Sequence, residues 1–129
     1  MSRVRGIGGV FFKSENPEAL RAWYAQHLGI VSEGEYGTAF HWNQPDSPAQ
    51  ENQTAWCIFP ASTKYFGASK ANLMINYVVD DLHATLQALR EEGVWVDDKV
   101  EEADYGKFGW IMDPDGNRIE LWEPLPKKS

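Results

Sequence analysis

Apolar and polar positions follow two different periods along the chain. Short apolar runs of strand length cover residues 7–12 and 73–79. After each run, apolar residues recur every three to four positions, which is typical of one face of an amphipathic helix. The pattern therefore predicts a strand followed by a helix, twice.

Each predicted helix carries start and stop signals. Asn16 can cap the first helix, Pro17 suits the first helical position, and Gly29 fits the stop. Asp81 can cap the second helix, and Gly93 can end it. We expect helices between these boundaries.

Further strands are predicted after each helix. Residues 36–43 and 54–60 have strand patterns and are separated by a loop at 43–52 that is rich in Pro, Gln and Asn. After the second helix, a strand is expected around 94–96.

The end of the chain predicts a β-hairpin. Two apolar runs flank 113–116, where Pro114 pre-sets the turn dihedral and Gly116 accepts a positive φ. The second hairpin strand, 117–122, places Glu120 among apolar residues. A carboxylate in such a strand needs a partner, because burying it without one costs free energy.

The two strand–helix patterns form an internal duplication with an offset of about 65 residues. Two copies are too few for an open array, so they must bury their faces on each other. The pattern predicts one α+β domain over 1–129, with module one at about 6–66 and module two at about 71–124. The linker at 60–70 carries Tyr65-Phe66-Gly67, close to the expected cavity mouth.

Composition and charge exclude several classes of protein. The 129 residues are 43% hydrophobic, which suits a packed globule. The net charge of −7, with no basic cluster apart from Lys127-Lys128, argues against nucleic acid as a partner. Cys57 is the single cysteine and no apolar signal segment begins the chain, so a reducing cytoplasm is expected. No apolar run approaches the ~20 residues of a membrane span.

Several segments together resemble the vicinal oxygen chelate superfamily of glyoxalase I, extradiol dioxygenases and bleomycin-resistance proteins. These segments are Asn16…Trp23-Tyr24…Leu28-Gly29, Val79-Asp80-Asp81-Leu82 and the hairpin motif at 113–122. The resemblance covers residues 6–124. It implies two βαβββ modules that form a curved mixed sheet around a cup-shaped cavity, and a homodimer.

The resemblance also implies metal-ligand positions on the first and last strands of each module. Glu120 matches one of them, whereas counting along the strands places Gly9 and Met74 at two others. The fourth falls at 56–58, where Cys57 is the only donor. Glycine has no donor and a thioether is a poor ligand for most divalent metals. We therefore expect no cofactor and no family-type metal, with a divalent metal on rearranged ligands as the alternative.

Strand alternation predicts which side chains line the cup. The expected ligand-binding residues are Phe11, His41, Trp42, Trp56, Met74, Asn76, Trp110, Arg118 and Trp122. Such a set is mostly apolar with a few polar groups, as in small-molecule sites, and its tryptophans can stack a planar or cationic ligand. The alternative is that the aromatic and Met side chains simply fill the core.

Glu120 allows two interpretations. It can form a structural salt bridge with Arg118, two residues away on the same strand face. It can instead act as a catalytic base or as a hydrogen-bond acceptor for a ligand, because burial raises a carboxyl pKa. Asn76 can donate a hydrogen bond in either case.

The leading functional hypothesis is a cytoplasmic, dimeric protein that binds a small organic molecule without a family-type metal. A second hypothesis is a glyoxalase-like lyase or isomerase that uses Glu120 as a base or, with His41, as a metal ligand. A third is a non-catalytic structural or regulatory module whose own side chains fill the cavity.

Overall fold

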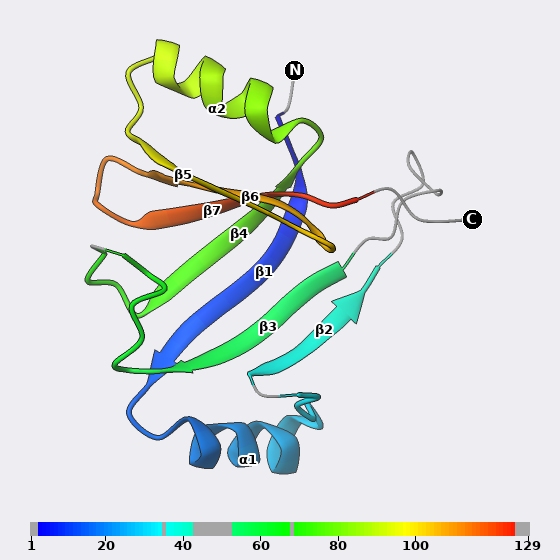
Figure 1. The fold of residues 1–129 in the computed structure, drawn as a ribbon. Helices are drawn as coiled ribbons and strands as arrows, with labels where there is room; N and C mark the ends of the chain where they lie inside the picture. Colours follow the sequence, from blue (N-terminus) through cyan, green and yellow to red (C-terminus); the bar gives the residue numbers. More distant parts are fainter. Residues whose placement is uncertain (1–2, 35, 43–52, 68, 126–129) are drawn as a thin grey trace.

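The computed structural model describes residues 3–34, 36–42, 53–67 and 69–125. The predicted loop at 43–52 and Lys127-Lys128 lie outside this part of the chain. Figure 1 shows the order of the elements. They are β1 (Val4–Ser14), α1 (Pro17–Leu28), β2 (Gly37–His41), β3 (Gln53–Pro60), β4 (Leu73–Val79), α2 (Leu82–Glu91), β5 (Val96–Ala103), β6 (Gly106–Met112) and β7 (Arg118–Glu123).

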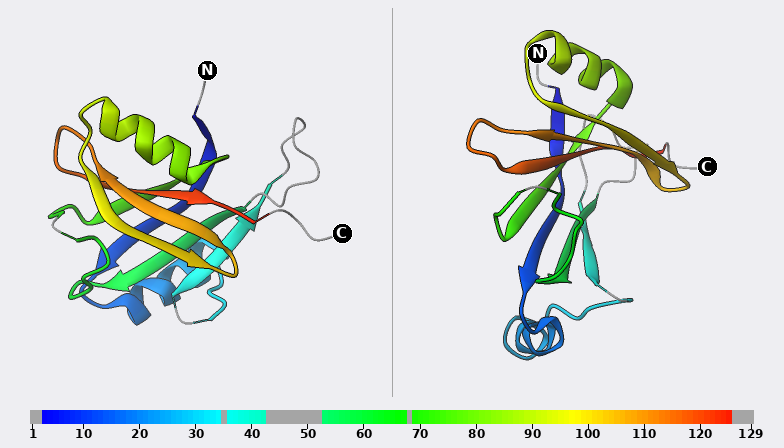
Figure 2. Two further views of the ribbon diagram at one scale, coloured as in Figure 1. Left: turned by 45° about the horizontal axis from the view of Figure 1, so that its top comes forward. Right: turned by 60° about the vertical axis from the view of Figure 1, so that its left-hand side comes forward.

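The strands form one open mixed sheet in the order β2-β3-β1-β4-β7-β6-β5. Within each module the first strand pairs in parallel with the last, as β1 with β3 and β4 with β7. The modules meet where β1 pairs antiparallel with β4. The sheet twists so strongly that β5, β6 and β7 cross the direction of β1 and β3 (Figure 2). The predicted α+β fold with a duplicated unit is confirmed.

Module one has fewer strands than the resemblance implies. Module two has three strands after its helix, whereas the described part of module one has two. An isolated bridge between Glu33 and Gly37 stands where a further strand would lie. Gly34 between them has a φ of 83°, so the chain turns back on itself instead of extending.

The predicted helix boundaries are confirmed. The Asn16 side chain accepts a hydrogen bond from the Ala19 N–H at 3.2 Å, and Gly29 ends α1 with a φ of 70°. Asp81 caps α2 in the same way, and Gly93 follows that helix with a φ of 85°. Neither helix in the described part of the chain is long and apolar enough to cross a membrane.

The strand expected around 94–96 is wrong in its bounds, because β5 begins only at Val96 and continues to Ala103. The Val94 N–H still bonds to the Leu89 carbonyl at 3.0 Å, so this residue completes the end of α2. The polar run at 97–99 has low β propensity, and pairing with β6 holds it in the sheet.

The two faces of the sheet hold separate apolar clusters. On one face α2 covers the sheet, and Leu82 and Leu86 pack with Val79 and Leu121. On the other face Phe11, Phe66, Met74 and Trp110 form the second cluster. Leu121 belongs to the cluster beneath α2, and side chains alternate along β7. Glu120 therefore lies on the other face, with Phe11, Phe66, Met74 and Trp110.

Replacing Leu86 by Ala is expected to lower the free energy of unfolding by about 2–5 kcal/mol, since the side chain is 2% exposed and a cavity remains. Denaturant titration measures the change. Gln87→Ala, on the exposed side of the same helix, is the control and should change stability by less than about 0.5 kcal/mol. Equal effects of the two variants would contradict this packing of α2.

Candidate functional site

Four residues lie level with one another across the central strands. Gly9 is opposite Ala55 on one side and Asn76 on the other, and Asn76 is opposite Glu120. Two of the ligand positions implied by the resemblance, Gly9 and Glu120, belong to this row of residues.

Two positions expected from counting lie beside this row. Met74 is opposite Phe11, one step from Asn76 on the same face. Ala55, not a residue at 56–58, is level with Gly9. Counting residues along one strand does not show which residues of neighbouring strands are opposite each other. Hydrogen-bond pairing between the strands decides this, and β1 is irregular between Ile7 and Gly9.

The row does not fit a family-type metal site. Only Asn76 and Glu120 carry donor atoms, while Gly9 and Ala55 carry none. A catalytic metal normally needs three protein ligands. Across the described ranges, no group of three or more His, Cys, Asp or Glu side chains is arranged to hold a metal.

A cavity of about 280 Å³ opens in front of this row. Its base comes from the central strands, whereas Tyr65 of the linker and Tyr105 of the turn between β5 and β6 also line it. The lining residues are Gly8, Phe11, Gln53, Ala55, Cys57, Tyr65, Asn76, Tyr105, Phe108, Glu120 and Trp122. Aromatic walls around a few polar groups are typical of small-molecule sites.

Glu120 is the buried acid of this cavity, with 1% of its surface exposed. The Tyr65 hydroxyl lies 2.8 Å from Oε1 and 3.0 Å from Oε2, and donates to this carboxylate. Burial raises the pKa of Glu120 to about 7 and Glu101 adds to the rise, whereas hydrogen bonds from Tyr65 and Asn76, and the charge of Arg118, lower it. The carboxyl group therefore exchanges its proton near neutral pH.

The proposed structural salt bridge between Glu120 and Arg118 is wrong. The Arg118 guanidinium bonds to Asp97 Oδ2 at 3.2 Å and lies 5.3 Å from the centre of the Trp110 ring. Arg118 thus extends towards β5 and away from the acid. Tyr65, from the linker between the modules, is the partner that Glu120 needs.

Burial also raises the pKa values of two further groups that line the cavity. Burial, followed by the charge of Glu120, raises the pKa of the Cys57 thiol to about 11, so the thiol stays protonated at neutral pH. The same causes raise the pKa of Tyr65 above its ordinary value. Tyr65 therefore acts as a hydrogen-bond donor to Glu120.

Three of the predicted ligand-binding residues line the cavity with Glu120, namely Phe11, Asn76 and Trp122. Met74 and Trp110 face the same side but belong to the apolar cluster. They are 1% and 2% exposed, so they support the cavity from within the core.

The remaining predicted residues lie elsewhere. His41 is exposed at the end of β2. The Trp42 Nε1–H donates to Thr54 Oγ1 at 2.9 Å. Trp56 packs edge-to-face on Phe12 beneath α1. Trp56 points away from the cavity because Ala55 and Cys57, its neighbours in β3, point into it.

Sequence reasoning missed several residues of the cavity. Period-two alternation along β3 could have identified Gln53, Ala55 and Cys57 together. An aromatic residue in the linker, near the expected cavity mouth, drew attention to Tyr65. Nothing in the local sequence indicates that its hydroxyl reaches Glu120, which is 55 positions away.

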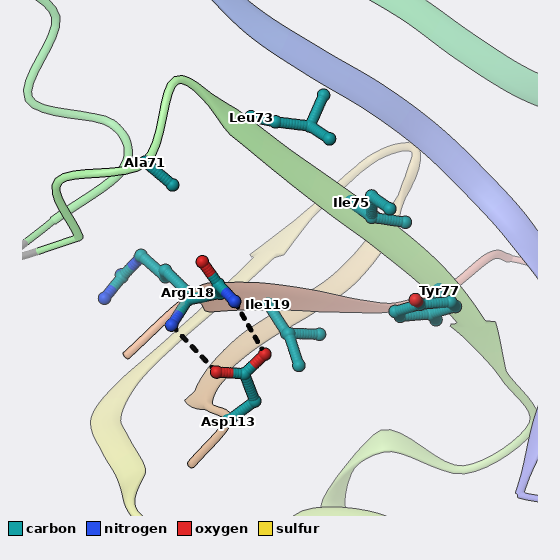
Figure 3. A pocket seen from close by; sticks show the side chains of 8 residues that line it. Ala71, Leu73, Ile75, Tyr77, Asp113, Arg118 and Ile119 are labelled. Carbon is teal, nitrogen blue, oxygen red and sulfur yellow. Dashed lines mark hydrogen bonds between the residues drawn. The ribbon is translucent and has the colours of Figure 1, made fainter. Parts of the chain in front are cut away.

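A second cavity of about 210 Å³ lies on the opposite face of β4 (Figure 3). Leu73, Ile75 and Tyr77 form its apolar wall. Its acid, Asp113, accepts hydrogen bonds at 2.9 Å from both the backbone and the side-chain amide of Asn117, and so holds the hairpin turn. The Glu120 cavity is therefore the better candidate.

Glu120→Gln is expected to stabilise the protein only at higher pH. The folded state keeps the proton up to a pKa of about 7, whereas an ordinary carboxyl releases it near 4.5. The contribution of the protonated carboxyl group to the free energy of unfolding is therefore fully present below about pH 4.5. It falls as the pH rises to about 7 and stays low above that value. The variant should be more stable than the natural protein by up to about 3 kcal/mol at about pH 8, and equal to it at about pH 4.

Denaturant unfolding at several pH values measures this difference. Glu91→Gln is the control, because it removes one exposed acid from α2 and leaves the cavity unchanged. A difference between Glu120→Gln and the natural protein that does not vary with pH would contradict the raised pKa.

Comparisons with known proteins agree with this architecture. A family model described as a glyoxalase-like domain matches residues 9–122. A search of curated proteins finds no match.

Several solved structures have the same fold. Methylmalonyl-CoA epimerase from Mycobacterium tuberculosis is 20% identical, with a TM-score of 0.67 over 98% of this chain and 93% of that one. A Streptomyces coelicolor methylmalonyl-CoA epimerase in complex with 2-nitronate-propionyl-CoA is 15% identical, with a TM-score of 0.69 over 99% of both chains. A glyoxalase/bleomycin resistance protein/dioxygenase superfamily member from Vibrio splendidus 12B01 is 12% identical, with a TM-score of 0.57 over 91% and 97%.

At these identities the similarity to solved structures shows the fold alone. The family match extends from Gly9 on β1 to Trp122 on β7 and so includes the row of residues that contains Glu120. It also confirms the resemblance expected from the hairpin motif. The chain belongs to the glyoxalase-like domain family.

Proposed function

We propose that this protein binds a small organic molecule in the Glu120 cavity without a family-type metal. The observation that carries the proposal is the buried carboxylate at the base of a cavity with aromatic walls. Perturbed titratable groups in such cavities are enriched at functional sites. The volume of about 280 Å³ suits a compact ligand.

The open cavity argues against the hypothesis of a module whose own side chains fill the cup. Phe108 and Trp122 stack with ring centres 5.9 Å apart and form one wall. A hydrogen bond from Trp122 Nε1 to the Tyr105 carbonyl, at 3.0 Å, ties this wall to the turn at the rim. These contacts hold the aromatic rings beside the cavity, where they can pack on a ligand.

A homodimer and a cytoplasmic location remain predictions from the sequence. The groups that hold the Glu120 carboxylate, Tyr65 among them, come from the same chain.

An Ala55→Phe variant is expected to lose ligand binding, because the new ring would occupy the cavity beside Glu120. A library of small organic molecules is screened by NMR, and hits should shift the signals of Asn76 and Trp122 in the natural protein. Binding should weaken about tenfold or more in the variant. Ala103→Phe, at an exposed position of β5, is the control.

Treatment with EDTA should leave the NMR hits unchanged. Hits that bind equally well to Ala55→Phe, or that need a stoichiometric divalent metal, would contradict the proposal.

Proton-transfer catalysis is a second candidate function, favoured by the Glu120 pKa of about 7. Several fold neighbours are named as epimerases, which invert a stereocentre. A comparable reaction here would use ionised Glu120 to remove a proton from a carbon acid. Lyase and isomerase chemistry of this kind begins with such a proton transfer, and hydrogen-bond donors of the site can stabilise the charge that develops.

If this second function holds, kcat/KM should rise with pH through about 7, because the base must be ionised. Glu120→Gln should lower the rate by about 10²–10⁴-fold. Exchange of substrate C–H for solvent deuterium, followed by NMR, measures both effects. An unchanged rate in Glu120→Gln would exclude this role and leave the binding function intact.

A further inference from the structure

We propose that the base of the Glu120 cavity is a subsite for an ammonium group, so that the ligand is a small organic amine with an apolar body. This inference rests on the proposed binding function and specifies the chemical class of its ligand. Three independent features of the cavity lead to it: its unpaired acceptors, its charge and its aromatic walls.

The first feature is an unpaired acceptor beside the acid. Asn76 is 2% exposed, and its side chain donates a hydrogen bond to Glu120. Its Oδ1 atom has no partner. A buried acceptor without a partner costs free energy, so a donor from a ligand gains more here than in water.

The Asn76 amide oxygen packs closely against Gly8. A Cβ at Gly8 would lie only 2.3 Å from Asn76 Oδ1 and 2.8 Å from the Trp122 ring. Both Gly8 and Asn76 line the cavity. Asn76 and Glu120 are opposite each other on neighbouring strands, and both line the cavity. A primary ammonium group, with its three donors, suits such a pair of acceptors.

The second feature is the charge of the cavity. None of the described lining residues is Lys, Arg or His, whereas Glu120 is acidic. Arg118, on the same strand face as Glu120, is bound to Asp97. An anionic ligand would face Glu120 without a compensating cation, while a cation would neutralise a buried carboxylate.

The third feature is the aromatic wall. Tyr105, Phe108 and Trp122 line the cavity together with Asn76 and Glu120. Aromatic faces attract cations and also pack on an apolar ligand body. The cavity therefore combines a site for the charged head with a surface for the rest of the amine.

The protonation state of Glu120 should govern this subsite. The groups that act on it come from several elements: Tyr65 from the linker, Cys57 from β3, Asn76 from β4, Glu101 from β5, and Arg118 from β7. Cys57 and Tyr65 hold their protons at neutral pH, so the carboxyl group of Glu120 is the one that changes charge near pH 7. Amine affinity should therefore rise as pH increases through this range.

The test compares three probes of similar size by isothermal titration calorimetry. The probes are benzylammonium, benzyl alcohol and benzoate, which carry positive, no and negative charge. At about pH 8, where Glu120 is ionised, benzylammonium should bind about tenfold or more tightly than benzyl alcohol, and benzoate should bind least. The benzylammonium affinity should fall at about pH 6.

Two variants and one control test whether the preference for benzylammonium arises at the Glu120 cavity. Glu120→Gln should remove both the preference for benzylammonium and its pH dependence, while Glu91→Gln, which removes one exposed acid, should keep both. Gly8→Ala should weaken benzylammonium binding because its Cβ would crowd Asn76 Oδ1. Circular dichroism confirms that each variant is folded before titration.

Tighter binding of benzyl alcohol or benzoate than of benzylammonium would overturn the ammonium subsite and leave the binding function standing. Failure of all three probes to bind at about 10 mM would also overturn the subsite. The library screen with Ala55→Phe then decides separately whether the cavity binds other molecules.

Discussion

The desolvation of the Glu120 carboxyl group is the constraint on which the candidate site depends. The side chain is 1% exposed in an apolar strand, and its partners are a phenol and an amide. Neither partner carries a positive charge, so hydrogen bonding offsets only part of the cost of burial. The result is a pKa of about 7, which allows the acid to change charge at physiological pH.

The duplicated architecture explains how Tyr65 and Asn76 reach this acid. The antiparallel contact between β1 and β4 brings the first strands of the two modules together, and β7 then pairs in parallel with β4. Asn76 therefore lies directly beside Glu120. The linker between the modules must pass over the open face of the sheet, where Tyr65 packs on Phe59 and reaches the carboxylate.

The fold is shared with superfamily members, but the donor atoms of this chain differ from a metal-binding set. Gly9 and Ala55 remove two donors from the row that contains Glu120. Ala55 lines the cavity beside the acid with a small side chain. The row that lacks metal donors thus borders a cavity, and aromatic rings form part of its wall.

Local sequence determined the elements of this protein, and tertiary structure decided the site. Caps at Asn16 and Asp81, the terminal hairpin and the burial of Glu120 could all be predicted, because periodicity and turn chemistry depend on near neighbours. The position of Asn76 beside Glu120 depended on strand register, and the pairing of Glu120 with Tyr65 depended on the linker. Both join residues far apart in the chain, so only the folded sheet could define them.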